Sequence, residues 1–463
     1  MDREVGRFSP AAAALAVAGS LLGYTTAPAS AAQPASRYSV VELPGVAQQI
    51  NNSGQVAGWI FVGSAAHAAI YSNGAVRDLG IPAGEQLSVL NGINDAGVAV
   101  GFSFVSLPPP SNSSDPDNRW QAVLAPPNAT AVQPLSAIAP DSFAYAINDA
   151  GAIVGCLDNY LDLFPDPHRA FVYANGTLTE LHGLLTPQPD NDYTCARDVN
   201  AAGVVVGEID ASGLRRGFVY RNSVATRLDQ GQRFMTMARA INSAGRIAGD
   251  GQLAGWSAEH ALTYDVTTAT FASLGVEATG ATASQGNDIN TRGDVVGGML
   301  LNVGQHAFLA SGGRVYDLND LIPAGTDWVL QEALSINDRG QIVGRGVRTG
   351  SPDVVRYVLL DASAPLASIA GLIAQVKALE AAGQLSHGQA TVLIAHLRCA
   401  ERHVRAGRCR LAAAALEFFG RHVDLLIRTH RLSAALGQPL IDEADRIIDD
   451  LLAPSAECQS CER

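Results

Sequence analysis

The sequence predicts an all-β domain, a seven-bladed propeller with four-stranded blades, followed by a small all-α helical bundle. Three observations carry this prediction: a short motif that occurs seven times, strand patterns with Gly-rich turns between its copies, and helical periodicity after Pro365. With 463 residues, 47% of them hydrophobic, the chain is long enough for both domains and a sizeable core.

The repeated motif is clearest as INDAGVAVG, from Ile93 to Gly101. Every copy has an Asn, a Gly three residues later and a second Gly four residues after the first, at intervals of 42 to 54 residues. Gly adopts a positive φ at no steric cost, and an Asn amide can bond its own backbone, so the motif fits a tight turn that starts each blade. Seven copies around a ring do not suit one active site. The Asn residues are Asn51, Asn94, Asn148, Asn200, Asn242, Asn290 and Asn337.

Each repeat reads as four short strands. The motif turn joins the first strand to the second, and a Gly-rich turn joins the third to the fourth. The third strand opens with a polar residue, and Arg, which occurs there three times, has no lone pair for a metal. We therefore expect structural hydrogen bonds from these residues to a backbone carbonyl or to the repeated Asn of the same blade. They are His67, Gln121, Arg169, Arg216, His260, His306 and Arg356.

The two ends of the array complement each other. The seventh repeat stops at Arg356–Asp361 without a fourth strand, and an unmatched strand pattern occurs at Tyr38–Gly45. An N-terminal strand that completes the last blade would close the ring, which protects the sheet edges of a propeller and which a solenoid does not need.

After the array, residues 366–452 show four amphipathic helical patterns, enough for a small bundle, and residues 453–463 form a tail that contains Cys458 and Cys461. At the other end, residues 1–32 resemble a signal peptide with an apolar run and a small-residue cleavage site. No later run is apolar and long enough for a transmembrane helix. A secreted, extracellular or cell-surface-associated protein is therefore expected.

The six cysteines fit an oxidising compartment as pairs. The expected disulfides are Cys156 with Cys195, between neighbouring blades, and Cys399 with Cys409, across the turn between the second and third helices. The tail cysteines are expected to form a local disulfide or to remain free thiols.

Two domains resemble known families. The INDRGQIVG-type turns together with HAFLA, from His306, resemble the HAF repeats of secreted bacterial proteins over residues 38–361. The segments LIAHLRCAERHV and AALEFFGRHVDLL resemble the FIMAH domain of exported bacterial proteins over residues 366–452. The first resemblance implies an extracellular propeller without a fixed activity. The second implies an accessory module for surface association or protein contact, without catalysis of its own.

The sequence constrains the function mainly by the classes of protein that it excludes. The net charge of −13 argues against a nucleic-acid partner, and the sequence lacks the common nucleophile, zinc-protease and phosphate-loop motifs. We expect a monomeric binding or scaffold protein for a glycan or an extracellular protein, with no catalytic residue and no metal site. The alternative is a propeller enzyme, a polysaccharide lyase or hydrolase, with a convergent catalytic set in the central channel.

The ligand site is expected on the face that carries the long, variable connections, at blades two to four, because variable loops on a rigid scaffold usually carry function. Aromatic and acidic residues are concentrated there, suited to stack on sugars, to bond their hydroxyls or to hold a Ca²⁺ ion, the one cofactor considered. The alternative interpretation is that the rings cap the core. The predicted ligand residues are Trp120, Asp158, Asn159, Tyr160, Asp162, Asp190, Asp192 and Tyr193.

Overall fold

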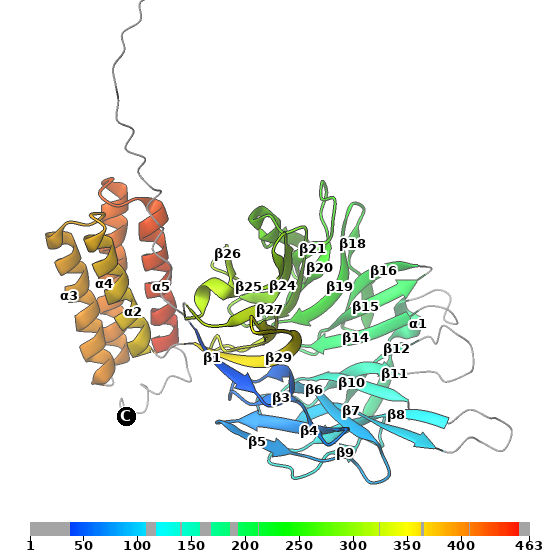
Figure 1. Cartoon of the computed structure of the whole chain (residues 1–463). Coiled ribbons are helices and arrows are strands. Elements are labelled where there is room, and N and C mark those ends of the chain that lie inside the picture. Colours follow the sequence, from blue (N-terminus) through cyan, green and yellow to red (C-terminus); the bar gives the residue numbers. More distant parts are fainter. Residues whose placement is uncertain are drawn as a thin grey trace, which may run out of the picture. The chain divides into compact units, whose positions relative to one another are not determined.

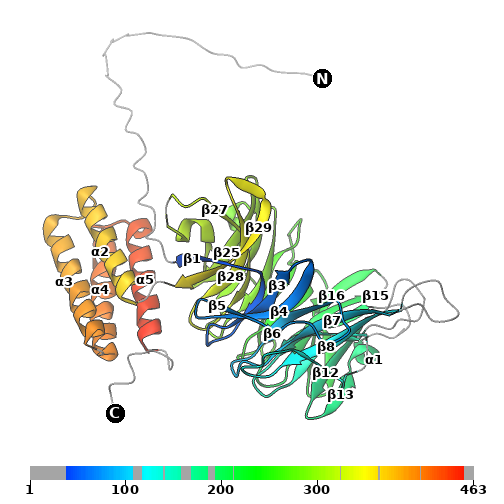
Figure 2. The same ribbon diagram turned by 60° about the horizontal axis from the view of Figure 1, so that its bottom comes forward.

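The computed structural model describes residues 38–107, 117–138, 141–157, 168–185, 193–211, 213–323, 325–362, 365–406 and 408–452. The predicted signal peptide and the cysteine-containing tail lie outside these ranges. Within them, seven antiparallel sheets surround a central axis (Figures 1 and 2), which confirms the seven-bladed propeller. Each blade has four strands. In blades one to six they follow sequence order from the axis outward, blade seven has the N-terminal β1 as its outermost strand, and blade five has a short extra strand at its inner edge.

The first three blades are formed by β2 (Val46–Ile50), β3 (Val56–Val62), β4 (Ala65–Ser72) and β5 (Ala75–Asp78); β6 (Leu87–Ile93), β7 (Ala99–Leu107), β8 (Asp117–Ala125) and β9 (Gln133–Pro134); and β10 (Ser142–Ile147), β11 (Ile153–Leu157), β12 (Arg169–Ala174) and β13 (Thr177–Glu180). The short helix α1 (His182–Leu185) follows.

Blades four to seven are formed by β14 (Tyr193–Val199), β15 (Val205–Ala211), β16 (Leu214–Arg221) and β17 (Val224–Arg227); β18 (Asp229–Gln230), β19 (Arg233–Ile241), β20 (Arg246–Gln252), β21 (His260–Asp265) and β22 (Thr270–Ser273); β23 (Ala283–Ile289), β24 (Val295–Leu301), β25 (Gly304–Ser311) and β26 (Arg314–Asp317); and β27 (Trp328–Ile336), β28 (Ile342–Arg348) and β29 (Ser351–Ala362). Two short 3-10 helices, η1 (Val276–Thr279) and η2 (Leu318–Leu321), lie in connections.

Blade seven is completed by the N-terminal strand, as the sequence predicts. β1 (Tyr38–Leu43) pairs antiparallel with β29, with Tyr38 opposite Ala362 and Leu43 opposite Tyr357. The closing interface between blades one and seven buries apolar side chains from both, and the other blade interfaces are built in the same way. The ring is therefore closed by backbone pairing within one blade and by apolar packing between blades.

The repeated Asn joins each blade to the next. Its Nδ2 donates to the backbone carbonyl of the Asn in the following blade, and its Oδ1 accepts the backbone N–H four residues later. All seven copies make both contacts, so the donors form a closed ring that ends with Asn337 bonded to Asn51. The Asn is thus a blade-to-blade link as well as a turn residue.

The two motif positions require Gly for different steric reasons. The first has a positive φ in every blade, for example +79° at Gly97, which confirms the predicted tight turn. The second lies against the innermost strand: a Cβ on Gly155 would lie 1.8 Å from the carbonyl oxygen of Phe143, and one on Gly101 would lie 1.9 Å from that of Val89. Any side chain there would push the two inner strands apart.

In five of the seven blades, the polar residue at the start of the third strand pairs with an acid and not with the expected backbone carbonyl or repeated Asn. His67 contacts Asp78 at 3.1 Å, and His306 contacts Asp317 at 2.5 Å, so the partner is an acid at the end of the fourth strand. Arg169, Arg216 and Arg356 make the equivalent ion pairs with Glu180, Asp229 and Glu42. The expected bond to the repeated Asn is wrong because that Asn lies at the opposite end of the blade and its amide is already engaged in the ring.

The C-terminal region contains the four predicted helices: α2 (Pro365–Ala381), α3 (His387–Arg405), α4 (Cys409–Arg428) and α5 (Ala434–Leu452). Ser386 caps α3 in a reciprocal capping box with Gln389. The four helices share a core that includes Leu393, Leu416 and Ile447. This core is continuous through the bundle and separate from the cores between blades.

Candidate functional site

Every innermost strand carries a β-bulge three residues before the motif Asn. In β14, Ala196 pairs with Gly207 and Asp198 with Val206, so Arg197 between them has no cross-strand partner. A bulge bends its strand and re-aims one side chain. All seven bulge residues line one cavity of about 410 Å³ on the propeller axis. They are Gln48, Asn91, Tyr145, Arg197, Arg239, Asn287 and Leu334.

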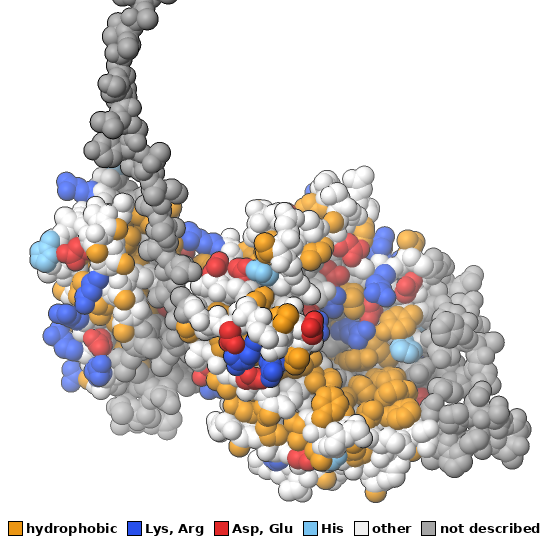
Figure 3. Space-filling view, viewed as in Figure 1, with side chains coloured by type: hydrophobic (Ala, Val, Ile, Leu, Met, Phe, Trp, Pro, Cys, Tyr) orange, Lys and Arg blue, Asp and Glu red, His pale blue; other side chains and the backbone are white. Residues whose placement is uncertain are grey.

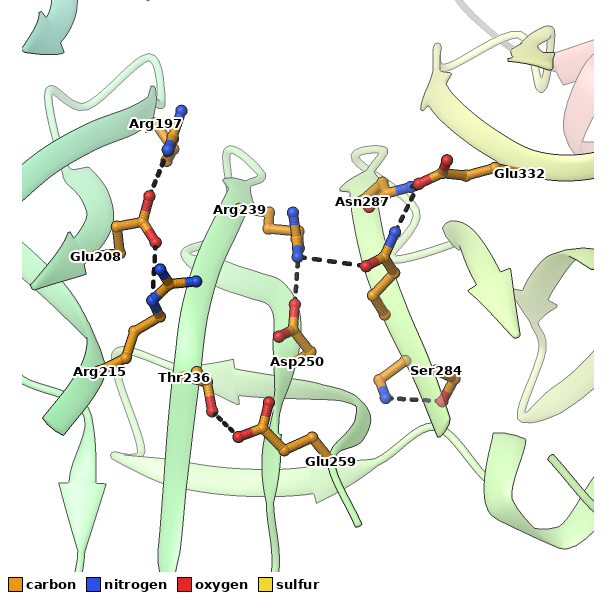
Figure 4. Close-up of polar contacts among 12 residues, drawn as sticks. Arg197, Glu208, Arg215, Thr236, Arg239, Asp250, Glu259, Ser284, Asn287 and Glu332 are labelled. Carbon is orange, nitrogen blue, oxygen red and sulfur yellow. Dashed lines mark hydrogen bonds and ion pairs between the residues drawn. The ribbon is translucent and has the colours of Figure 1, made fainter. Parts of the chain in front are cut away.

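Arg197 is the most heavily engaged of these residues. Its guanidinium donates to Glu208 Oε1, with Nε at 3.0 Å, and lies 4.5 Å from the ring centroid of Tyr145. Arg215 approaches the other oxygen of Glu208 from the opposite side at 3.8 Å (Figure 4). Burial alone opposes the charge of Arg197, but Glu208 and the neighbouring tyrosines outweigh it and raise the pKa of the guanidinium. Glu208, which is buried, therefore lies between two cations.

Blades five to seven continue this polar wall (Figure 4). Arg239 donates from Nε to the buried Asp250 at 2.7 Å. The buried Glu332 accepts from Gln285 at 2.6 Å and from Asn287 at 3.0 Å. Each acid is held by donors from its own or the neighbouring blade, so the wall is fixed by hydrogen bonds across blades.

Blades two to four contribute an aromatic patch, defined by Phe102, Phe104, Trp120, Phe143, His168 and Tyr193. Neighbouring ring centroids lie 4.6 to 6.0 Å apart, from Phe104–Trp120 to Phe143–His168. All six rings are half-buried and so keep part of their surface in solvent. Figure 3 shows hydrophobic side chains gathered over this region, beside charged ones.

Tyr193 connects the patch to the polar wall. Its ring lies 4.9 Å from that of His168, and its hydroxyl contacts Glu208 Oε1 at 3.4 Å and an Arg197 nitrogen at 3.3 Å. Burial, which outweighs the nearby Arg197 charge, raises the pKa of Tyr193, so the hydroxyl stays protonated. An apolar surface and a set of fixed donors and acceptors therefore meet at one residue.

Two more carboxyls, those of Asp198 and Asp288, line the cavity and are half-buried. Asp198 accepts the backbone N–H of Val199 and of Ile241 in the next blade, both at 2.7 Å. Burial raises the pKa of Asp198 to about 7, with a further contribution from Asp288, and the backbone donors oppose this rise. Asp288 makes the equivalent contact to Ile336, and burial raises its pKa as well. These carboxyls accept backbone N–H groups of the following blade and so tie neighbouring blades together.

The structure brings together the two predicted ligand residues that it describes. Trp120 and Tyr193 are linked through Phe143 and His168 in the aromatic patch. The others lie outside the described ranges and remain predictions, as does the Ca²⁺ ion. They are Asp158, Asn159, Tyr160, Asp162, Asp190 and Asp192. Within the described ranges, no group of three or more His, Cys, Asp or Glu residues is arranged to hold a metal.

Sequence reasoning missed the bulge ring and the acids that face it. The sequence does contain a pattern that indicates the bulge residues: the residue three positions before the motif Asn is polar or aromatic in six of the seven repeats. A strictly alternating strand pattern does not show that such a residue faces the axis, since the bulge shifts the alternation by one residue.

The first predicted disulfide is confirmed, and the second is wrong. Cys156 and Cys195 are bonded and join blade three to blade four. Cys399 is a free thiol, whereas Cys409 is bonded to a different residue. Helix α3 continues six residues past Cys399, which places this thiol about 9 Å along the axis from the helix end, out of reach of the first residue of α4.

Comparison with known protein families gives a match for one region of the chain. Residues 369–449 match the FIMAH domain. This match covers the helical bundle and leaves the propeller unassigned, so the HAF-repeat resemblance stays a prediction. No curated protein matches the chain. Within the described residues, no helix is long and apolar enough to cross a membrane.

Two solved structures are similar to the propeller. One is the β-propeller domain of the Trilobed protease from Pyrococcus furiosus, at 11% identity and a TM-score of 0.39, over 61% of this chain and 84% of that one. Another is the acylaminoacyl peptidase of Pyrococcus horikoshii, at 9% identity and a TM-score of 0.45, over 70% of this chain and 51% of that one. This chain therefore spans about half the length of the peptidase.

Proposed function

We propose that this protein is an extracellular binding protein whose ligand is a glycan, held on the aromatic patch with its terminal sugar at the mouth of the channel. The observation that carries the proposal is the position of Tyr193, whose ring extends the aromatic patch and whose hydroxyl belongs to the Arg197–Glu208 contact. A sugar has apolar C–H faces and a rim of hydroxyls, so it requires both kinds of surface side by side.

The dimensions and compartment agree with this proposal. A cavity of about 410 Å³ is in the range of small-ligand sites and is too narrow for a folded partner. The Cys156–Cys195 disulfide is of a kind that persists in oxidising compartments, which supports export together with the signal peptide expected at residues 1–32.

The contacts favour binding over the alternative of a lyase or hydrolase. The carboxylates described around the channel serve as hydrogen-bond acceptors. Asp250 accepts from Arg239, and Glu332 accepts from Gln285 and Asn287. Asp198 and Asp288, which line the cavity, accept backbone N–H groups of Ile241 and Ile336 in the following blades. A general acid or base needs a carboxyl that is free to exchange a proton with the substrate. These groups act instead as fixed parts of a polar wall.

A glycan array probed with the purified chain, followed by calorimetry with the best-bound oligosaccharide, tests the proposal. Trp120→Ala removes the central ring of the patch and is expected to weaken binding about tenfold, the usual scale of an aromatic contact. Tyr193→Phe keeps the ring and removes the hydroxyl, so it should weaken binding less.

Phe61→Ala is the matched control, because Phe61 is an exposed ring on β3, outside the patch. Its binding should equal that of the parent. Melting temperatures of all variants separate lost binding from lost folding. Folded Trp120→Ala protein that binds the oligosaccharide as the parent does would show that the rings only cap the core and that the site is elsewhere.

A further inference from the structure

The helical bundle exposes an apolar row on α4. Leu411, Phe418 and Leu425 are spaced seven residues apart, and so lie on one side of the helix. They are 50%, 58% and 54% exposed, although the opposite side of the same helix is fully packed in the core. Single exposed apolar residues are ordinary, but a row along two full heptads indicates a contact surface.

Helix α3 extends this surface. The His396 ring stacks on Phe418 with centroids 6.4 Å apart and lies 5.8 Å from the ring of His422. Val392, four residues before His396, is also exposed. We call the surface formed by Val392, His396, Leu411, Phe418, His422 and Leu425 the α3–α4 face.

The same two helices carry a strong positive charge in an acidic protein. Residues 387–431 contain eight arginines and three acids, whereas the whole chain has a net charge of −13. All three acids are paired within a helix, by Arg405, Arg421 and Arg428. The five arginines that no ion pair in the described ranges engages are Arg398, Arg402, Arg408, Arg410 and Arg431.

Three of the arginines on these two helices lie beside the apolar row. Arg421 and Arg428 each follow a residue of the row by three positions, and the Arg421 guanidinium lies 4.7 Å from the Phe418 ring centroid. Arg410 directly precedes Leu411. In Figure 3, several Lys and Arg side chains lie on the helical bundle.

We propose that the α3–α4 face docks on a bilayer that contains anionic lipids. Apolar side chains in one row, with arginines beside them, match the boundary between acyl chains and acidic headgroups, where Leu and Phe enter the apolar layer and Arg stays at the headgroups. A soluble polyanion would use the arginines but would leave the apolar row without a role. The protein would then bind the membrane peripherally.

Co-sedimentation of the full chain with vesicles tests this proposal. Vesicles of phosphatidylcholine mixed with phosphatidylglycerol should bind the chain, with affinity falling as salt rises, and pure phosphatidylcholine vesicles should bind it weakly. Arg402→Gln with Arg410→Gln should weaken binding about fivefold per arginine. Phe418→Ser with Leu425→Ser should abolish it, and because all four side chains are exposed, the variants should fold normally.

Matched controls lie on the propeller: Phe61→Ser removes an exposed apolar side chain, and Arg233→Gln removes an exposed arginine. Both should bind as the parent does. Equal binding to neutral and anionic vesicles, or parental binding by the folded α3–α4 variants, would overturn the proposal. So would heparin binding that the arginine variants lose and the apolar variants keep, or a dimer that the apolar variants dissociate, since these outcomes assign the face to a soluble polymer or to a second copy.

Discussion

Asn337 donates a hydrogen bond from its side-chain amide to the backbone carbonyl of Asn51 at 2.9 Å, across 286 positions of the chain. This contact closes the ring of seven Asn links and joins the last blade to the first. The Oδ1 atom of Asn337 accepts from Gln341 N–H at 3.0 Å, so one buried side chain holds its own turn and the neighbouring blade together.

Replacing Asn337 with Ala should lower the free energy of unfolding by roughly 2 to 4 kcal/mol, because it leaves the Asn51 carbonyl and the Gln341 N–H buried without this partner. Asn337→Asp keeps the acceptor but places a buried carboxylate oxygen against the Asn51 carbonyl, so its effect should be at least as large. Urea denaturation of both variants measures the difference. Equal stability of Asn337→Ala and the parent would show that the ring does not stabilise the closed propeller.

Deleting residues 38–45 should expose the outer edge of β29, because β1 is its partner on that side. An unpaired edge strand promotes association with other chains. We expect a large fall in melting temperature or aggregation, measured by thermal unfolding and light scattering. A deletion variant that melts as a monomer at the parental temperature would contradict closure by this strand.

The Cys156–Cys195 bond spans 39 positions, and replacing both residues with Ser should lower the free energy of unfolding. The chain-entropy relation gives about 4 kcal/mol for a loop of this size. Both side chains are buried beside the aromatic patch, so glycan binding should weaken as blades three and four loosen. Cys399→Ser is the control, since this thiol is free, and it should unfold like the parent.

Raising the pH from about 5 to 8 should destabilise the propeller through Asp198. Its pKa is raised to about 7 in the folded chain, from 3.8 as the ordinary value. The folded state therefore holds the proton more tightly than the unfolded state, and this stabilisation is lost as the pH rises through 7. Asp198→Asn should be less stable at pH 5, where it lacks one acceptor, and should show a smaller fall in melting temperature between pH 5 and 8. An equal fall in both proteins would assign the pH dependence elsewhere.

Much of the fold was predictable because every blade has the same local conformational requirements. Every blade needs a tight turn with a positive φ, and the first motif Gly, such as Gly97, adopts that φ. The sequence of a single repeat is enough to predict this turn. The missing fourth strand of the last repeat and the unmatched strand at Tyr38 likewise predicted how β1 closes the ring.

The partners of individual side chains were not predictable to the same degree. The motif Asn looked like a residue that bonds its own turn, and it also bonds the next blade. His67 pairs with Asp78 rather than with that Asn. The Cys399–Cys409 pairing failed because the length of α3 sets the distance between the two thiols, and this length follows from packing in the bundle rather than from local pattern.

The sequence by itself determined the number of blades, the turn at the start of each, the closing strand and the helical region, since these depend on local conformational preferences that recur seven times. Only the tertiary structure decided that Arg197 and its six equivalents face one cavity, because a bulge in each inner strand re-aims a residue that strict alternation would place elsewhere. The meeting of Tyr193 with Glu208 and Arg197 likewise arises only when neighbouring strands and blades pack, which fixes distances that no spacing along the chain encodes.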